Sequence, residues 1–409
     1  MQTYTTMIDV MLMSKQPLKK AAIIGAGSMG HGIAQLLIMT GTEVTLVDIS
    51  DEILAKAKQK IGWSIDKFVE KRTVNETDAN AAKARLHTTT NMNEAFKDAD
   101  LIIEAAPENL EMKKKLFAQI DKVAPKHAIL GSNTSTLSIT ELGKMTSRPD
   151  KVVGLHFFNP PQMMPLLEII KGAQTSDETT KFALDLAKKL GKTPVLVKKD
   201  VRGFIVNGIL AAVFNEAFWA VERKEATRDE IDSAMKYQAG LPMGIFELAD
   251  FVGLDILNSV AKEMEDALGA RAKACPIYEP LVKAGKLGQK TGEGFYSWSA
   301  GRPRIPFELA DKFDPNRLYT MAANAAAWLV HEDVASPADI DTAMKFGTGW
   351  PSGPCELADK MGIDTVVKNL NELHMKHPEP MYEPCPLLLE YVKNGRLGRK
   401  AGQGFHKYK

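Results

Sequence analysis

Two ionisable residues interrupt apolar stretches in the segment GLHFFNPPQMMPLLEII, residues 154–170. His156 lies among glycine, leucine and phenylalanine, and Glu168 lies in the run LLEII. Burying a lone charge is costly, so such groups are usually paired or hydrogen-bonded. If the two runs form neighbouring strands, the pair can act as a general base with its supporting anion, because imidazole titrates near neutral pH. The alternative is a core histidine bonded to a backbone carbonyl, with the glutamate at a strand edge.

A glycine-rich turn occurs earlier in the chain, between the strand-like run AAIIG and a helical stretch. The motif GAGSMG consists of Gly25, Ala26, Gly27, Ser28, Met29 and Gly30. In this setting Gly25 permits the tight turn, Gly27 lets a pyrophosphate approach the backbone, and Gly30 allows close packing of the helix on the strand. The N-terminus of the helix then faces the phosphates. The motif therefore predicts a dinucleotide site.

Asp48 ends the next strand-like run, 18 residues beyond the last glycine of the motif. A carboxylate at this place accepts hydrogen bonds from a ribose diol and repels a 2′-phosphate, which favours NAD over NADP. A nicotinamide cofactor nearby would give His156 a role in a hydride-transfer reaction. His156 would take the proton of a hydroxyl group whose carbon gives up a hydride, while Glu168 fixes the tautomer of the imidazole. The alternative to a dinucleotide site is that the glycine-rich motif forms a purely structural turn and that Asp48 is a surface residue.

Strand-like and helical stretches alternate through the first half of the chain, and these elements must position the site. The strand-like runs are residues 21–25, 43–48, 85–90, 100–105, 128–133, 152–158, 166–170 and 193–199. The helical stretches are residues 28–41, 51–72, 109–124 and 177–190. This alternation predicts an α/β domain with a mostly parallel sheet that ends near Lys199.

The second half is helical throughout and contains a repeat. Residues 207–255 align without gaps with residues 316–364, and 20 of the 49 pairs are identical. The segment LGQKTGEGFY at 287–296 also recurs as LGRKAGQGFH at 397–406. Such self-similarity indicates homologous repeats. We therefore expect a dinucleotide-binding domain at residues 18–200 and two all-helical domains, copy 1 at 201–301 and copy 2 at 302–409.

Composition and charge exclude several classes of protein. The 409 residues carry a formal net charge of +1 and no polybasic block, so neither a nucleic acid nor a membrane is expected as a partner. No apolar run reaches the length of a membrane span. The three cysteines are far apart, which argues against a zinc site or a disulfide framework and predicts a cytoplasmic protein. Residues 1–17 lack the pattern of a signal peptide and are expected to be a disordered leader.

Residues 18–409 resemble the L-3-hydroxyacyl-CoA dehydrogenases, including the 3-hydroxybutyryl-CoA dehydrogenases. Five stretches carry the resemblance: GAGSMG with Asp48, EAAPENLEMKKKLF at 104–117, SNTS at 132–135, HFFNPP at 156–161 with Glu168, and GFIVN at 203–207. The resemblance implies a Rossmann-type domain followed by two helical domains of the 6-phosphogluconate-dehydrogenase-like type. It implies that His156 is the catalytic base and Glu168 its partner, and that Ser135 and Asn207 hold the substrate oxygens near the base.

The same resemblance assigns further binding residues. Glu108, Lys113, Ser135, Asn159 and Lys290 match positions at the NAD site, and Ser64 and Lys71 match positions that bind coenzyme A. Each assignment has a structural alternative. Ser135 could cap the following turn, Asn207 could be a helix-start residue, and Glu108 and Lys113 could form an exposed charged helix face. Asn159 could be a turn former before proline, and the lysines near Ser64 could be a solvated face. One residue departs from the family pattern, since Gly208 follows Asn207 where an arginine is usual.

The implied function is NAD-dependent interconversion of a 3-hydroxyacyl-CoA and a 3-ketoacyl-CoA, with a short acyl chain. Two alternatives stay open at this point: a dehydrogenase of a free 3-hydroxy acid, and a non-catalytic NAD-binding protein of the same fold. For the duplication we expect the two helical copies to pack together as an internal pseudo-dimer, so that the whole chain is a monomer or a weak homodimer.

Overall fold

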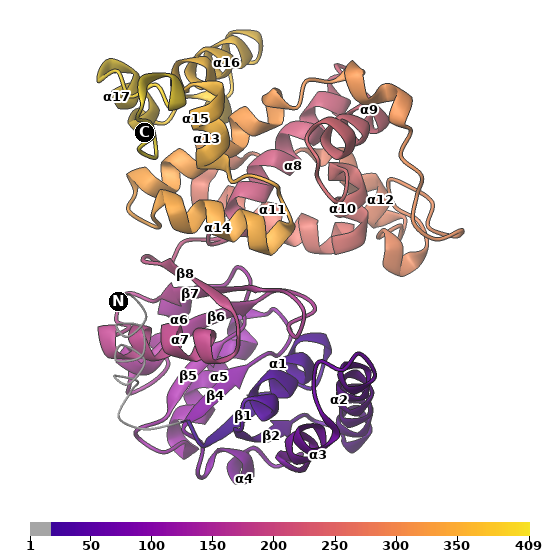
Figure 1. Cartoon of the computed structure of the whole chain (residues 1–409), viewed down its shortest axis with the longest axis vertical. Helices are drawn as coiled ribbons and strands as arrows, with labels where there is room; N and C mark the ends of the chain where they lie inside the picture. The colour runs from indigo at the N-terminus through magenta and orange to yellow at the C-terminus, as the bar shows by residue number, and fades with distance from the viewer. Residues whose placement is uncertain (1–17) are drawn as a thin grey trace, which may run out of the picture. The chain divides into compact units, whose positions relative to one another are not determined.

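The computed structural model describes residues 18–409, which form two compact units (Figure 1). The first unit ends at Asp200, and the second extends from Val201 to Lys409. The leader expected at residues 1–17 lies outside the described residues. No helix among residues 18–409 is long and apolar enough to cross a membrane.

An eight-stranded sheet forms the centre of the first unit. Its strands are β1 (Lys20–Ile24), β2 (Glu43–Val47), β3 (Leu86–Thr89), β4 (Leu101–Glu104), β5 (Ile129–Ser132), β6 (Val152–Phe157), β7 (Leu166–Lys171) and β8 (Thr193–Val197). They lie in the order β3-β2-β1-β4-β5-β6-β7-β8. The pair β6–β7 is antiparallel, and the other neighbouring pairs are parallel. The predicted fold class, an α/β domain with a mostly parallel sheet, is confirmed.

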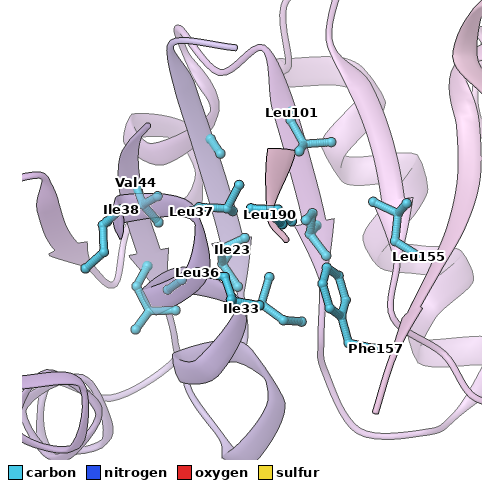
Figure 2. Packing of buried hydrophobic residues seen from close by; sticks show 14 of the residues in the cluster. Ile23, Ile33, Leu36, Leu37, Ile38, Val44, Leu101, Leu155, Phe157 and Leu190 are labelled. Atoms are coloured by element: carbon cyan, nitrogen blue, oxygen red, sulfur yellow. The ribbon is translucent and has the colours of Figure 1, made fainter. Parts of the chain in front are cut away.

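Helices cover the sheet and bury its apolar residues. They are α1 (Ser28–Met39), α2 (Asp51–Glu70), α3 (Glu76–Ala84), α4 (Met92–Phe96), α5 (Leu110–Val123), α6 (Ile139–Gly143) and α7 (Asp177–Lys189). One cluster joins residues of α1, α2, α3 and α7 to alternate residues of the strands. Figure 2 shows Ile33 and Leu37 of α1 beside Ile23 of β1, with Leu155 and Phe157 of β6 in the same cluster. The strands β4 and β6 are buried along their whole length, as expected when both faces of a parallel sheet are covered.

The second unit is helical, as predicted. Its helices are α8 (Val206–Glu222), α9 (Arg228–Ser233), α10 (Ile245–Val252), α11 (Leu254–Leu268), α12 (Glu279–Lys283), α13 (Asn316–His331), α14 (Pro337–Thr348), α15 (Pro354–Met361), α16 (Ile363–Lys376) and α17 (Pro386–Lys393). A π-helical turn, Ala234–Gln238, follows α9, whereas α14 is continuous at the equivalent place.

Both helical copies use the same buried aspartates to hold their turns. Asp232 in copy 1 and Asp341 in copy 2 each accept hydrogen bonds from two backbone N–H groups in the first turn of the next helix. Asp250 and Asp359 each accept two more from the segment after the glycine-rich turn near the end of their copy. The identities between the repeats thus include residues that satisfy buried backbone donors.

The two copies contact each other through α8 and α13, and a group of charges lies at their boundary. Arg317 of copy 2 donates to two acids of copy 1, with Nε 2.5 Å from Glu216 Oε1 and Nη2 2.6 Å from Glu225 Oε2. The hydroxyl group of Tyr382 also donates to Glu216, at 2.5 Å. Burial would raise the pKa of Glu225, but hydrogen bonds and charges from copy 2, including those of Arg317 and His377, outweigh it and lower the pKa to about 2.

We expect Arg317→Met in the full chain to lower the free energy of unfolding by about 3 kcal/mol at pH 7, because it leaves Glu216 fully buried without its cation. Adding Glu216→Gln should recover part of this loss. Since the pKa of Glu225 falls from 4.5 to about 2 on folding, its contribution is present above pH 4.5 and is lost towards pH 2.

The measurement is equilibrium unfolding in urea, monitored by circular dichroism. Lys345→Met is the matched control, because Lys345 pairs with Glu356 inside copy 2 and both side chains are about a third exposed. It should cost under about 1 kcal/mol. Equal losses for Arg317→Met and Lys345→Met would contradict the prediction.

Candidate active site

The glycine-rich turn lies between β1 and α1, and at two of its glycines, Gly25 and Gly30, neighbouring backbone lies too close for a side chain. A Cβ at Gly25, where φ is +94°, would lie 2.6 Å from the carbonyl oxygen of Ala105. A Cβ at Gly30 would lie 1.7 Å from the carbonyl oxygen of Gly25. Only glycine at this position lets the first turn of α1 pack against the glycine-rich turn. A Cβ at Gly27 would meet nothing within 4 Å, and α1 has neither a side-chain cap nor an acid in its first turn. The N-terminus of α1 is therefore open to an anion such as a pyrophosphate.

Asp48 directly follows β2 and supports this turn. Its Oδ2 accepts a hydrogen bond from the N–H group of Ala26 at 2.7 Å, and its Oδ1 accepts one from the N–H group of Ile49 at 2.7 Å. A carboxylate oxygen can accept more than one hydrogen bond. Asp48 can therefore shape the glycine-rich turn and still bind the two hydroxyl groups of a ribose.

A buried ion pair lies at the carboxyl end of β4. Lys113 Nζ lies 2.6 Å from Glu104 Oε1, and the two side chains are 1% and 0% exposed. The same amine donates to the carbonyl oxygen of Ala106 and lies 3.1 Å from Glu108 Oε2. The hydroxyl group of Ser132 donates to the second oxygen of Glu104 at 2.6 Å. The alternative in which Glu108 and Lys113 form an exposed helix face is wrong, because Lys113 is buried and Glu108 precedes α5. Glu104 is a further residue of this region that local sequence does not reveal, because its pairing with Lys113 depends on the fold.

Glu108 accepts several hydrogen bonds from the turn that follows β5. Its Oε1 accepts hydrogen bonds from Thr134 Oγ1 at 2.5 Å, from the N–H group of Ser135 at 2.8 Å and from Ser135 Oγ at 3.2 Å. Burial raises the pKa of Glu108, but Lys113 and these donors outweigh burial and hold it below its usual value. The following helix, α6, is capped by Ser138 and not by Ser135. Ser135 is therefore not the N-cap of α6, and its role at the substrate stays a prediction.

His156 and Glu168 are direct neighbours across the antiparallel pair β6–β7. His156 Nδ1 lies 2.6 Å from Glu168 Oε2, and the side chains are 7% and 0% exposed. Leu155 and Phe157 point into the cluster shown in Figure 2, so the alternation of the strand directs His156 to the other face of the sheet. The ring of Phe158 lies 4.5 Å from the imidazole, centre to centre. The arrangement holds one ring nitrogen against a carboxylate, as a general base requires.

The loop after β6 contacts the start of α1. Asn159 Oδ1 accepts a hydrogen bond from Ser28 Oγ at 3.1 Å, which joins this loop to the glycine-rich turn. Apart from Ser64 and Lys71 on α2, the assigned site residues of the first unit lie at or beside the edge of the sheet where β1, β2, β4, β5 and β6 end, which is where ligands of open α/β sheets bind.

The other four assigned residues belong to α2 or to the second unit. Ser64 is half-buried on α2, and Lys71 is exposed at the C-cap of the same helix. Asn207 occupies the first turn of α8 in the second unit. Lys290, also in the second unit, pairs with Asp255 at 2.5 Å. Its counterpart in copy 2, Lys400, pairs with Asp364 in the same way at 2.6 Å. The shared ion pair gives Lys290 a structural role, and its contact with NAD stays a prediction.

Comparisons with known proteins identify the family. Residues 20–201 match the model of the 3-hydroxyacyl-CoA dehydrogenase NAD binding domain, and residues 203–298 and 313–408 each match the C-terminal domain. The chain is 42% identical over 292 residues to the mitochondrial hydroxyacyl-coenzyme A dehydrogenase of Rattus norvegicus, covering 69% of this chain and 91% of that protein. The chain belongs to the 3-hydroxyacyl-CoA dehydrogenase family. It is therefore an NAD-dependent oxidoreductase with a duplicated C-terminal domain.

Two further relatives agree with this assignment. A probable 3-hydroxybutyryl-CoA dehydrogenase of Bacillus subtilis is 39% identical over 282 residues, which cover 69% of this chain and 98% of that protein. The crystal structure of 3-hydroxybutyryl-CoA dehydrogenase from Escherichia coli K12 superimposes with a TM-score of 0.87 at 29% identity, covering 93% of this chain and 99% of the other.

The glycine-rich turn and Asp48 generate a prediction about the cofactor. We expect Asp48→Asn to narrow the preference for NADH over NADPH by about tenfold or more, because it removes the charge that repels a 2′-phosphate. Asparagine keeps an oxygen that can accept from the N–H group of Ala26, so the turn should be preserved. The measurement is kcat/KM for both cofactors, with Asp51→Asn, at an exposed position in the first turn of α2, as the control. A parent protein that uses NADPH better than NADH would overturn the role of Asp48.

Proposed function

We propose that the chain interconverts a (S)-3-hydroxyacyl-CoA and the corresponding 3-ketoacyl-CoA, with a short acyl chain as in 3-hydroxybutyryl-CoA and acetoacetyl-CoA. The observation that carries the proposal is the buried His156–Glu168 pair, 2.6 Å apart, in the unit that binds NAD. A binding protein has no need of a base held in this way. The names of the relatives from Rattus and Bacillus support the substrate class.

His156 moves the proton in this proposal. When bound, the oxidised cofactor would accept a hydride from C3 of the acyl chain, and the reduced cofactor would return one to it. Nδ1 of His156 is held by Glu168, so the proton of the 3-hydroxyl group is exchanged at Nε2. The carboxylate stabilises the imidazolium that forms, and Glu168 is a positioning residue because it acts through His156.

Other residues hold the reactants. Ser135 and Asn207 supply the donors near the substrate oxygen, where charge develops in the transition state. Glu108 and Lys113 fix the turn that carries Ser135 and lie at the nicotinamide end of the site, together with Asn159.

Coenzyme A is bound in this proposal by Ser64 and Lys71, through hydrogen bonds and charge. In an unbroken helix, residues seven apart lie on the same side, and α2 extends to the residue before Lys71. The two side chains can therefore contact one ligand.

Turnover on matched substrates tests the function and the base together. We expect oxidation of NADH with acetoacetyl-CoA and a much lower kcat/KM with free acetoacetate. His156→Gln should lower kcat by about 10²–10⁴-fold while NADH affinity stays nearly unchanged. Glu168→Gln should cost less and should shift the rise of the oxidation rate to lower pH, because the imidazolium loses its anion. An unchanged kcat in His156→Gln would exclude this base, and equal rates on the free acid would exclude the coenzyme A thioester as the specific substrate.

We also propose that the chain divides into domains at residues 18–200, 201–301 and 302–409, and that the two helical copies form an internal pseudo-dimer. The packing of α8 on α13 and the ion pairs of Arg317 with Glu216 and Glu225 support the pairing. Linking the copies raises their effective concentration for each other. A monomer or weak homodimer follows, and the cytoplasmic location stays a prediction.

Copy 2 should act as a structural brace, giving one active site per chain. We expect calorimetry to find one NADH per full-length chain. A chain ending at Gly301 should expose the apolar face of α8 and dimerise or aggregate, because a large uncovered apolar surface favours association. The measurement is sedimentation equilibrium of the shortened and full-length proteins. A stable, soluble monomer of the shortened chain would contradict the pseudo-dimer.

A further inference from the structure

A buried lysine lies beneath the loop that follows the catalytic histidine. Lys192 occupies the turn between α7 and β8 and is 8% exposed. Its amine donates to the carbonyl oxygens of Pro161 at 2.6 Å and Met164 at 2.7 Å. Its own backbone is held by a hydrogen bond to the carbonyl oxygen of Ala187 at 2.9 Å. The side chain therefore ties a fixed point beside the sheet to the loop at residues 158–165.

This loop joins the parts of the candidate site. It begins where β6 ends, just after His156, and leads into β7, which carries Glu168. Within it Asn159 bonds to Ser28 at the start of α1. It also lies against α1, since a Cβ at Gly32 would be 2.6 Å from the side-chain oxygen of Gln162. A shift of the loop would therefore disturb both the histidine–glutamate pair and the contact with the dinucleotide helix.

The environment of Lys192 favours a role in holding carbonyl groups. Among residues 18–409, its amine has no acidic side chain within ion-pair distance, and burial lowers its pKa to about 8. A neutral amine keeps two N–H donors, so both carbonyl oxygens can be satisfied with or without the third proton. Loss of the amine would leave two carbonyl oxygens of the loop without this donor.

We propose that Lys192 is a positioning residue, whose amine fixes the 158–165 loop so that Asn159 meets Ser28 and His156 stays aligned with Glu168. The inference rests on the proposed function for its effect on turnover. Its effect on NADH binding does not depend on which substrate the enzyme uses.

The main test is Lys192→Met, which keeps an apolar stem and removes the donors. We expect kcat to fall by about tenfold to a hundredfold and the Kd of NADH, measured by calorimetry, to rise by about fivefold to tenfold, scales that a small misplacement of reacting groups can produce. Lys188→Met, at an exposed position in the last turn of α7, is the matched control and should leave both quantities within twofold.

Chemical rescue separates positioning from general stability. Lys192→Ala removes three carbons and the amine, which n-propylamine matches, whereas propionitrile has the same number of heavy atoms and no donor. We expect n-propylamine to restore NADH affinity and kcat in a saturable way and propionitrile to restore neither. If Lys192→Met does not fold, Lys192→Gln, which keeps an NH₂ group with two donors, replaces it and should give values between those of Lys192→Ala and the parent.

Three outcomes would overturn the proposal. The first is a folded Lys192→Met with parental kcat and NADH affinity, even if its melting temperature is lower. The second is equal rescue by the amine and the nitrile. The third is parental values in Lys192→Gln together with parental values in Lys192→Ala. Weakened NADH binding without turnover on coenzyme A thioesters in the parent would instead refute the substrate and leave the role of Lys192 supported.

Discussion

The reversal of chain direction between β6 and β7 is the constraint on which the candidate active site depends. In an antiparallel pair, directly opposite residues present their side chains on the same face. The register places Glu168 opposite His156, while Leu167 and Ile169 point into the apolar cluster on the other face. A slip by one residue would turn the carboxylate into that cluster and take Leu167 and Ile169 out of it. The apolar residues thus fix the register, and the register fixes the pair.

Charges near this pair are held before any ligand arrives. Glu104 and Lys113 neutralise each other in a fully buried position, and Glu108 accepts hydrogen bonds from the turn that carries Ser135. Groups fixed in this way need little reorganisation during a reaction, which is how preorganised sites stabilise developing charge. Lys192 extends the same arrangement with backbone carbonyls in place of an acid.

The sequence predicts the sheet better than it predicts the connections. Each of the eight strand-like runs overlaps one strand, because apolar runs between turns have few other places in an α/β domain. The short helices α3, α4 and α6 were missed, since helices of five to nine residues carry little periodicity. The local sequence around Lys192 does not predict its burial or its hydrogen bonds either. Lys192 belongs to the polar run KKLGKTP, and its acceptors lie 31 and 28 residues away.

The predicted roles within the site also differ in how much local sequence can say. Gly25 and Asp48 follow from a motif whose spacing reflects contacts between adjacent elements. Lys113 could be taken for part of a charged helix face, because its burial depends on Glu104, which lies in another element. Such long-range pairing requires the fold to be known.

Differences between the two helical copies carry information that their identities do not. In the alignment of the copies, Gly208 corresponds to Arg317, Glu216 to Ala325, and Glu225 to Val334. Copy 2 therefore keeps the arginine and copy 1 keeps the acids. In a symmetric pair of identical copies, each copy would need both the arginine and the acids. In the pairing of copy 1 with copy 2, it is enough that one copy has the arginine and the other has the acids.

The departure at Gly208 has an explanation in this asymmetry. If two copies of the type of copy 1 met through the same surfaces, Glu216 would be buried without a cation, which is strongly unfavourable. The arginine that the family usually places after the asparagine is present in copy 2, where its partners are across the boundary. If the two copies pair within the chain as proposed, the absence of the matching arginine from copy 1 favours that pairing over pairing between chains, because Glu216 and Glu225 then both meet Arg317.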